Sequence, residues 1–135
     1  QLGVAFVPFS PLARGVFGTP MADPARFAKD EFRSRIPRFH PENWPHNKLK
    51  LQAFHAFAES RGLTPPALAL AWLLDRGAHV LPIPGTRSAD HLRAWARAPE
   101  IDLDDHDRDE IDRLLPIGHR SSARTAPIRQ GSWAA

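Results

Sequence analysis

The apolar positions along the chain predict two strands. Residues 2–9 (LGVAFVPF) are apolar at almost every position and end at Ser10-Pro11. Residues 79–83 form a second, mostly apolar run that ends before Pro84-Gly85. Short runs without a polar face are typical of strands that are buried on both sides of a sheet, so we expect two such strands.

Apolar residues at a spacing near 3.6 predict helices between and after the strands. Residues 47–61 repeat in this way and end before Gly62. A second helix is expected from the N-cap Thr64 to Asp75, with Pro65 in its first turn. Because this helix is apolar nearly all round, we expect it to be deeply buried.

Two further helices are predicted in the last third of the chain. Ser88 is expected to cap a helix that extends to about residue 98. Another helix should cover about residues 105–115, with Asp104 or Asp105 as its N-cap. Its inner stripe is expected to comprise Leu103, Ile111, Leu114 and Leu115.

A long irregular segment separates the first strand from the first long helix. Residues 19–45 contain five prolines, and a short helix at about residues 25–32 is the only regular element expected there. Loops of this length inside a compact domain are usually functional.

The order of elements predicts the fold class. Strands that alternate with helices indicate parallel pairing and an α/β fold. Two strands are too few to cover both faces of a sheet or to satisfy its edges. The chain also starts at Gln1 inside an apolar run, so we expect the missing strands to lie in a longer chain.

Composition limits the classes of partner. The net charge of +3 comes from Arg120, Arg124 and Arg129, because the other residues carry equal numbers of acidic and basic side chains. We therefore expect residues 117–135 to form a flexible basic tail, and we expect no nucleic-acid surface. No apolar stretch approaches the roughly 20 residues of a membrane helix, so no membrane partner is expected. The absence of cysteine fits a cytoplasmic protein, and the dispersed histidines predict no metal site.

Two strand ends carry candidate chemistry. The segment FSPLARG follows the first strand, and IPGTRS follows the second and runs directly into a helix. Ligands of parallel α/β folds bind at the carboxyl ends of the strands. Glycine and hydroxyl side chains before a helix favour a phosphate, and Arg87 could bind one through two hydrogen bonds. An ordinary capped strand-to-helix turn is the alternative interpretation.

Several motifs in order resemble the aldo-keto reductase family. They are PFSPLARG, PRF, EN, RGLTPPALALAWLLDRG, LPIPGTRS and IDRLLP, and together they span about residues 3–116. The resemblance implies that residues 1–116 are the C-terminal part of an NADP-dependent oxidoreductase domain. That domain is a (β/α)8 TIM barrel, of which this chain would supply the last two strands and their helices, an incomplete barrel.

The resemblance also assigns roles in the first loop. Phe9 matches the aromatic position whose ring stacks on the nicotinamide of the cofactor. Ser10, Leu12 and Gly15 match the loop that wraps the pyrophosphate. These residues are therefore expected to bind NADP(H).

The second loop is expected to hold the adenosine end of the cofactor. Gly85, Thr86 and Ser88 match the family's loop around the adenosine phosphate. Arg87 matches the basic segment associated with the 2′-phosphate that distinguishes NADP from NAD, and His91 matches a polar position near the adenosine.

One pair of positions departs from the family pattern. Where the family usually has Glu and Asn in contact with adenine, this chain has Ala94 and Trp95. The indole of Trp95 is expected either to stack on the base or to pack against the barrel.

The resemblance implies an enzyme that moves a hydride from NADPH to a small-molecule aldehyde or ketone, or runs the reverse reaction on an alcohol. Family members use a Tyr as general acid, supported by Lys, Asp and His residues on earlier strands. This chain contains no tyrosine, so we assign no catalytic residue to it. The alternative is a truncated, non-catalytic fragment that binds a nucleotide or acts like a regulatory subunit.

Overall fold

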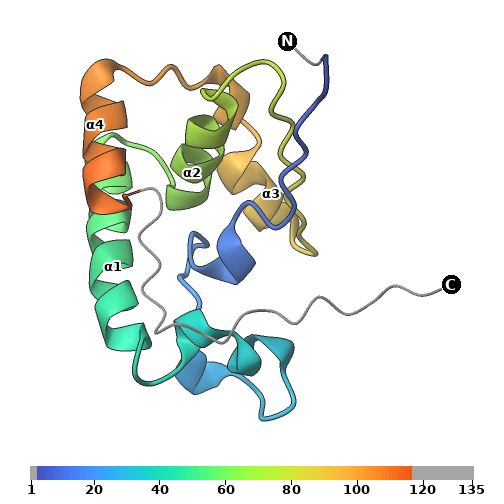
Figure 1. The fold of residues 1–135 in the computed structure, drawn as a ribbon, viewed down its shortest axis with the longest axis vertical. Coiled ribbons are helices and arrows are strands. Elements are labelled where there is room, and N and C mark those ends of the chain that lie inside the picture. The colour runs from blue at the N-terminus through green and yellow to red at the C-terminus, as the bar shows by residue number, and fades with distance from the viewer. Residues whose placement is uncertain (1–2, 117–135) are drawn as a thin grey trace, which may run out of the picture.

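The computed structural model describes residues 3–116 and consists mainly of helices (Figure 1). The predicted tail, residues 117–135, lies outside the described residues. Helices α1 and α4 lie side by side, with α2 between this pair and α3 (Figure 1). No helix among the described residues is long and apolar enough to cross a membrane. The α-helices are α1 (Trp44–Ser60), α2 (Pro65–Leu74), α3 (Ala89–Trp95) and α4 (Asp105–Leu114).

The two predicted strands run parallel to each other, as expected, but they pair only at isolated points. Phe6 bridges Val80 and Phe9 bridges Ile83. The backbone N–H of Phe6 donates to the carbonyl of His79 at 2.7 Å, and the N–H of Leu81 donates to the carbonyl of Phe6 at 2.8 Å. Residues 3–116 form no continuous strand, so the prediction of two full strands is wrong for this structure.

The predicted burial of these segments on both faces is also wrong. Phe6 is 58% exposed and Phe9 is 75% exposed, whereas Val80 is buried. Apolar side chains are buried only where a neighbouring element covers them, and no described element covers the outer side of residues 4–9. The pattern of the sequence is that of a buried strand, and the structure lacks the cover that this pattern implies.

The helices begin and end where their capping residues place them. The N–H of Ala67 donates to Oγ1 of Thr64 at 3.3 Å, which satisfies a free donor at the start of α2. Helix α1 begins at Trp44, three residues before its predicted start, because Pro45 is well suited to the first helical turn. Helix α3 ends at Trp95, about three residues earlier than expected, and a 3-10 turn, Ala98–Glu100, follows it.

Helix α4 is fixed at its start by a capping box. The side chain of Asp104 accepts from the N–H of Asp107 at 2.8 Å, and the side chain of Asp107 accepts from the N–H of Asp104 at 3.3 Å. Asp107 is also buried and lies 2.7 Å from Nε of Arg61 at the end of α1. This ion pair joins α4 to α1.

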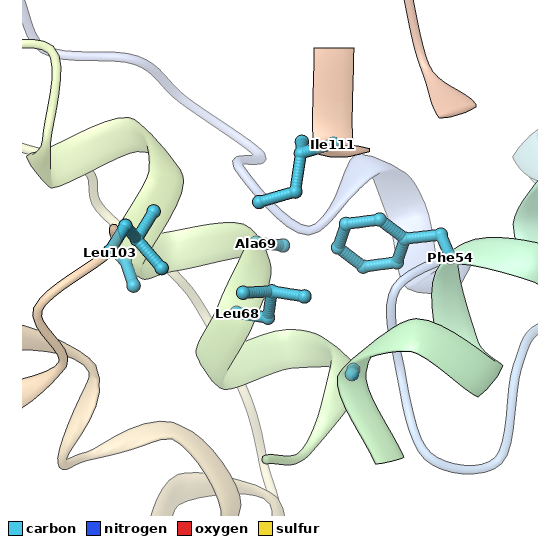
Figure 2. Packing of buried hydrophobic residues seen from close by; sticks show 7 residues of the cluster. Phe54, Leu68, Ala69, Leu103 and Ile111 are labelled. Atoms are coloured by element: carbon cyan, nitrogen blue, oxygen red, sulfur yellow. The ribbon is translucent and has the colours of Figure 1, made fainter. Parts of the chain in front are cut away.

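Two groups of buried side chains hold the helices and the long loop together. The larger group joins α1, α2 and α4 through Phe54, Leu68, Ala69 and Ile111, with Leu103 beside them (Figure 2). The smaller group comprises Val16, Phe39 and Leu51 and fixes the long loop against α1.

The long loop between residues 19 and 45 is ordered by short turns. The prediction of a short helix at about residues 25–32 is wrong. The structure instead has two 3-10 turns at the ends of this range, Pro24–Arg26 and Phe32–Arg35. A further 3-10 turn, Pro37–Phe39, places the Phe39 ring 5.0 Å from that of Phe27. The loop therefore folds back towards residues 13–16 rather than extending into solvent.

Candidate functional site

A cavity of about 940 Å³ lies where the loop after the first apolar segment meets the loop after the second. Ser10 and Thr86, which are 76 positions apart in the sequence, both line it. The parallel pairing of residues 6–9 with residues 80–83 brings the two loops together. Of the nine residues that the sequence predicts for a nucleotide site, seven line this cavity: Ser10, Leu12, Gly15, Gly85, Thr86, Arg87 and His91.

Phe9 and Ser88 are the two predicted residues that do not line the cavity. The Phe9 backbone is paired with Ile83, and its ring is directed largely to solvent. The hydroxyl oxygen of Ser88 instead accepts from the N–H of His91 at 3.4 Å, which makes Ser88 the N-cap of α3. Ser88 therefore orients the loop and the helix.

The first loop has an unusual backbone conformation. Ser10, Ala13, Arg14 and Gly15 all have positive φ angles, between 49° and 99°. The N–H of Ala13 donates to the carbonyl of Ser10 at 2.8 Å, and the N–H of Gly15 donates to the carbonyl of Leu12 at 3.0 Å. Non-glycine residues with positive φ carry strain of order 1 kcal/mol or more, and they cluster at ligand sites. The loop is thus bent sharply around one side of the cavity.

The second loop presents hydroxyl, imidazole and guanidinium groups to the cavity. Oγ1 of Thr86 accepts from the N–H of Ser88 at 3.1 Å and lies 3.5 Å from Nδ1 of His91. Arg87 is exposed and forms no ion pair with any residue between 3 and 116. A free guanidinium at a cavity wall can bind a phosphate through two hydrogen bonds.

The long loop contributes cavity residues that sequence reasoning did not identify. Arg33 and Glu31 line the cavity, and so does Arg14 of the first loop. Nη1 of Arg33 donates to the carbonyl of Arg14 at 3.3 Å, and its guanidinium lies 4.2 Å from the centre of the Phe27 ring. The only signal for Glu31 and Arg33 in the sequence was the length of the loop, because their position depends on contacts between distant segments.

The charge of the cavity suits an anion. Arg14, Arg33 and Arg87 contribute three cationic side chains, and Glu31 is the one carboxylate among its described lining residues. A side-chain hydrogen bond from Arg33 holds the pKa of Glu31 below its usual range. Glu31 therefore offsets the charge of Arg33, and the remaining cations favour a negatively charged ligand.

The wall beside α3 is apolar. Trp95 is half-buried and lines the cavity together with Ala94 and Pro66. The hydroxyl of Thr64 donates a hydrogen bond to the carbonyl of Ala94. Trp95 thus belongs to the cavity lining, and whether its indole stacks on a base or packs against the barrel stays a prediction.

The described residues hold no cluster of side chains suited to a metal ion. No group of three or more His, Asp or Glu side chains lies close enough together within residues 3–116. His119, one of the seven histidines, lies outside the described residues.

Comparisons with known proteins identify the family that this chain resembles. The model of the aldo/keto reductase family matches residues 1–116. A probable aldo-keto reductase of Glycine max is 36% identical over 124 residues, which is 92% of this chain and 36% of that protein. An NADP(+) aldo-keto reductase, yakc, of Schizosaccharomyces pombe is 33% identical over 124 residues, which again is 92% of this chain and 36% of that protein.

A solved structure supports the similarity in three dimensions. A glycerol dehydrogenase of Gluconobacter oxydans superposes with a TM-score of 0.74 at 25% identity. The match covers 94% of this chain and 38% of the dehydrogenase. The chain thus spans little more than a third of the length of these relatives.

Proposed function

Because this chain belongs to the aldo/keto reductase family, we propose that it supplies the NADP(H)-binding part of an oxidoreductase. The complete enzyme would interconvert small carbonyl compounds and alcohols. The observation that carries this proposal is that both loops line one and the same cavity, whose lining includes three arginines and an ion-paired carboxylate.

The residues present fit a dinucleotide that carries several phosphates. Arg87, Arg14 and Arg33 offer guanidinium groups, and Ser10 and Thr86 offer hydroxyl donors. A Cβ atom added at Gly85 would meet nothing within 4 Å, so the second loop leaves open space beside its backbone. Such a site combines charge with small residues that let a phosphate approach the main chain.

Each loop has a distinct role in this proposal. Ser10, Leu12 and Gly15 lie along the pyrophosphate, and Arg87 binds the 2′-phosphate of NADP(H). The exposed ring of Phe9, next to Ser10, is available to stack on the nicotinamide. The bound cofactor supplies the hydride, and these residues hold and orient it.

We further propose that residues 4–9 and 80–83 are the last two strands of a (β/α)8 barrel. Val4, Phe6, Phe9, Leu81 and Ile83 expose large apolar side chains along this pair. Neighbouring strands of the complete barrel would cover them, which would account for the apolar pattern of the sequence. The proton donor must then come from those other strands, because the chain contains no tyrosine.

A non-catalytic role as a nucleotide-binding or regulatory fragment uses the same cavity. The absence of a tyrosine favours this alternative for the 135 residues alone. NADPH-dependent reduction of an aldehyde by the full-length protein that contains this chain distinguishes the two, since only the enzyme shows turnover.

The experiment that tests the cofactor assignment replaces Arg87 with Ala in the full-length protein. Loss of hydrogen bonds to a charged phosphate costs about 1.5–3 kcal/mol, which corresponds to roughly a 10- to 100-fold rise in the Kd for NADPH. The Kd for NADH should change little, because NADH has no 2′-phosphate. Fluorescence titration of each reduced cofactor measures both constants.

Arg93→Ala is the matched control. Arg93 lies on α3, is paired with Asp90 at 2.5 Å and does not line the cavity. Its replacement should leave both constants unchanged. Equal losses of NADPH and NADH affinity in Arg87→Ala would contradict the assignment of Arg87 to the 2′-phosphate.

A further inference from the structure

A histidine outside the cavity is hydrogen-bonded to the loop that forms one of its walls. Nε2 of His55, on α1, lies 3.0 Å from the carbonyl oxygen of Val16, 39 positions earlier in the chain. A carbonyl oxygen accepts hydrogen bonds and cannot donate them, so Nε2 of His55 carries a proton and is the donor. Val16 directly follows Gly15, which lines the cavity, whereas His55 does not line it. Any effect of His55 on a ligand must therefore pass through the loop.

Resting on the function proposed above, we propose that His55 is a positioning residue for the cofactor. Its hydrogen bond to Val16 holds the first loop in the conformation that receives the pyrophosphate of NADP(H). His55 itself touches neither the cofactor nor the reacting atoms in this arrangement.

The conformation of the first loop needs support from outside the loop. Ser10, Ala13 and Arg14 have positive φ angles, and such conformations persist only where the surrounding structure fixes them. The carbonyl groups of residues 13–15 are all bound by donors from later in the chain, which are the N–H groups of Gly18 and Ala22 for Gly15, the guanidinium of Arg33 for Arg14 and that of Arg38 for Ala13. The bond from His55 extends this support to Val16 and connects it to a helix.

Helix α1 holds the end of the loop through three contacts of different kinds. The ring of Phe54, which lies in the core (Figure 2), is 5.0 Å from the ring of Phe17. The side chain of Val16 is buried in one cluster with Leu51. Apolar contacts have no preferred direction, whereas a hydrogen bond does. The bond from His55 therefore fixes the orientation of the Val16 carbonyl, which the two apolar contacts leave free.

The test compares two substitutions of His55 that differ in reach. The amide nitrogen of Gln lies as many bonds from Cβ as Nε2 of His does, so His55→Gln keeps a donor at the right distance. The amide nitrogen of Asn lies one bond closer to Cβ, so His55→Asn loses the hydrogen bond. Both variants remain polar, and melting curves followed by circular dichroism show whether each is folded.

The Kd values for NADPH and NADH are measured by fluorescence titration of the full-length protein. We expect His55→Asn to raise the Kd for NADPH roughly 3- to 10-fold, and His55→Gln to stay within about twofold of the unmodified protein. The Kd for NADH should rise by the same factor in His55→Asn, because both cofactors contain the pyrophosphate. This equal loss differs from the loss for NADPH alone that is expected of Arg87→Ala.

His106→Asn is the matched control. His106 lies on α4 with its ring 6.3 Å from that of Phe57, and it does not line the cavity, so both constants should stay unchanged. Unchanged affinities in His55→Asn, or an equal loss in His55→Gln, would overturn the proposal, and a lower melting temperature alone would mark a purely structural residue. A loss for NADPH but not NADH would also overturn it while leaving the cofactor assignment intact. If the unmodified protein binds neither cofactor, the proposed function is wrong and the inference falls with it.

Discussion

Single residues determine the shape of the candidate site. The first loop reverses direction at Gly15, whose φ of 99° is rarely adopted by residues with a side chain. A Cβ atom there would meet Ala22 at 3.4 Å and Nη1 of Arg33 at 3.5 Å, which are ordinary contact distances. The backbone angle, rather than crowding, therefore makes glycine necessary at this position.

Replacing Gly15 with Ala should lower the free energy of unfolding by about 1–2 kcal/mol. The cause is the positive φ, which an added Cβ atom disfavours. Urea unfolding of the full-length protein, followed by circular dichroism, measures the difference. Gly85→Ala is the control and should have much less effect, because a Cβ atom at Gly85 meets nothing within 4 Å and its φ lies outside the positive range. Equal stability of the two variants would show that the first loop tolerates a side chain.

The residues that the sequence identified are those in local motifs. Thr86, Arg87 and His91 follow one another closely in the chain, and their chemistry could be interpreted without a structure. Arg33 could not be found in the same way, because its cavity position depends on a contact with Arg14, 19 residues away. Ser88 belongs to a motif, yet the structure places its hydroxyl at the start of α3 rather than at the cavity.

At the scale of elements, charged side chains join the ends of the helices. Arg108 on α4 binds Asp75, at the end of α2, through two hydrogen bonds of 2.8 and 3.0 Å. The hydrogen bonds from Arg108 hold the pKa of Asp75 below its usual range. This pair connects the C-terminal helix to the helix at the centre of the fold.

The Asp75–Arg108 pair predicts a dependence of stability on pH. The pKa of Asp75 is lower in the folded state than its ordinary value of 3.8, so its contribution is fully present above about pH 4. That contribution is lost as the pH falls through the folded-state pKa. Asp75→Asn should therefore lower the melting temperature by roughly 1–3 °C at pH 7, and the difference should shrink as the pH approaches 2.

Melting curves of the full-length protein between pH 2 and pH 7 measure this effect. Asp109→Asn is the control. Asp109 lies on α4 next to Arg108, is exposed and forms no ion pair with the described residues. Its melting temperature should follow that of the unmodified protein at every pH. A constant difference between Asp75→Asn and the unmodified protein down to pH 2 would contradict the role of the pair.

Helices were predictable from the sequence because each carries its own start and stop signals. Thr64, Asp104 and Gly62 act on the backbone beside them, so α2, α4 and the end of α1 follow from local rules. The strand segments depend on neighbours elsewhere. Their pattern correctly indicated parallel pairing, but continuous strands and burial require cover that residues 3–116 do not provide.

At the scale of the whole molecule, the chain combines a well-covered helical part with an exposed apolar edge. Phe54 and Leu68 are almost completely buried between α1 and α2, whereas Phe6 and Phe9 are mostly exposed. The chain spans 36% of the length of its curated relatives. In the proposed barrel, the remaining strands would pair with the exposed segments at residues 4–9 and 80–83. The cavity would then lie at the carboxyl ends of these strands, where the two loops follow them.

The central claim is that two loops, far apart in the sequence, bind one NADP(H) molecule. Hydrogen exchange of the full-length protein, with and without saturating NADPH, tests it most directly, because bound ligand slows exchange where it contacts or orders the backbone. The account predicts slower exchange in residues 9–15 and in residues 83–95 together, with no change in the middle of α1. Slower exchange in only one of these segments, or in neither, would contradict it.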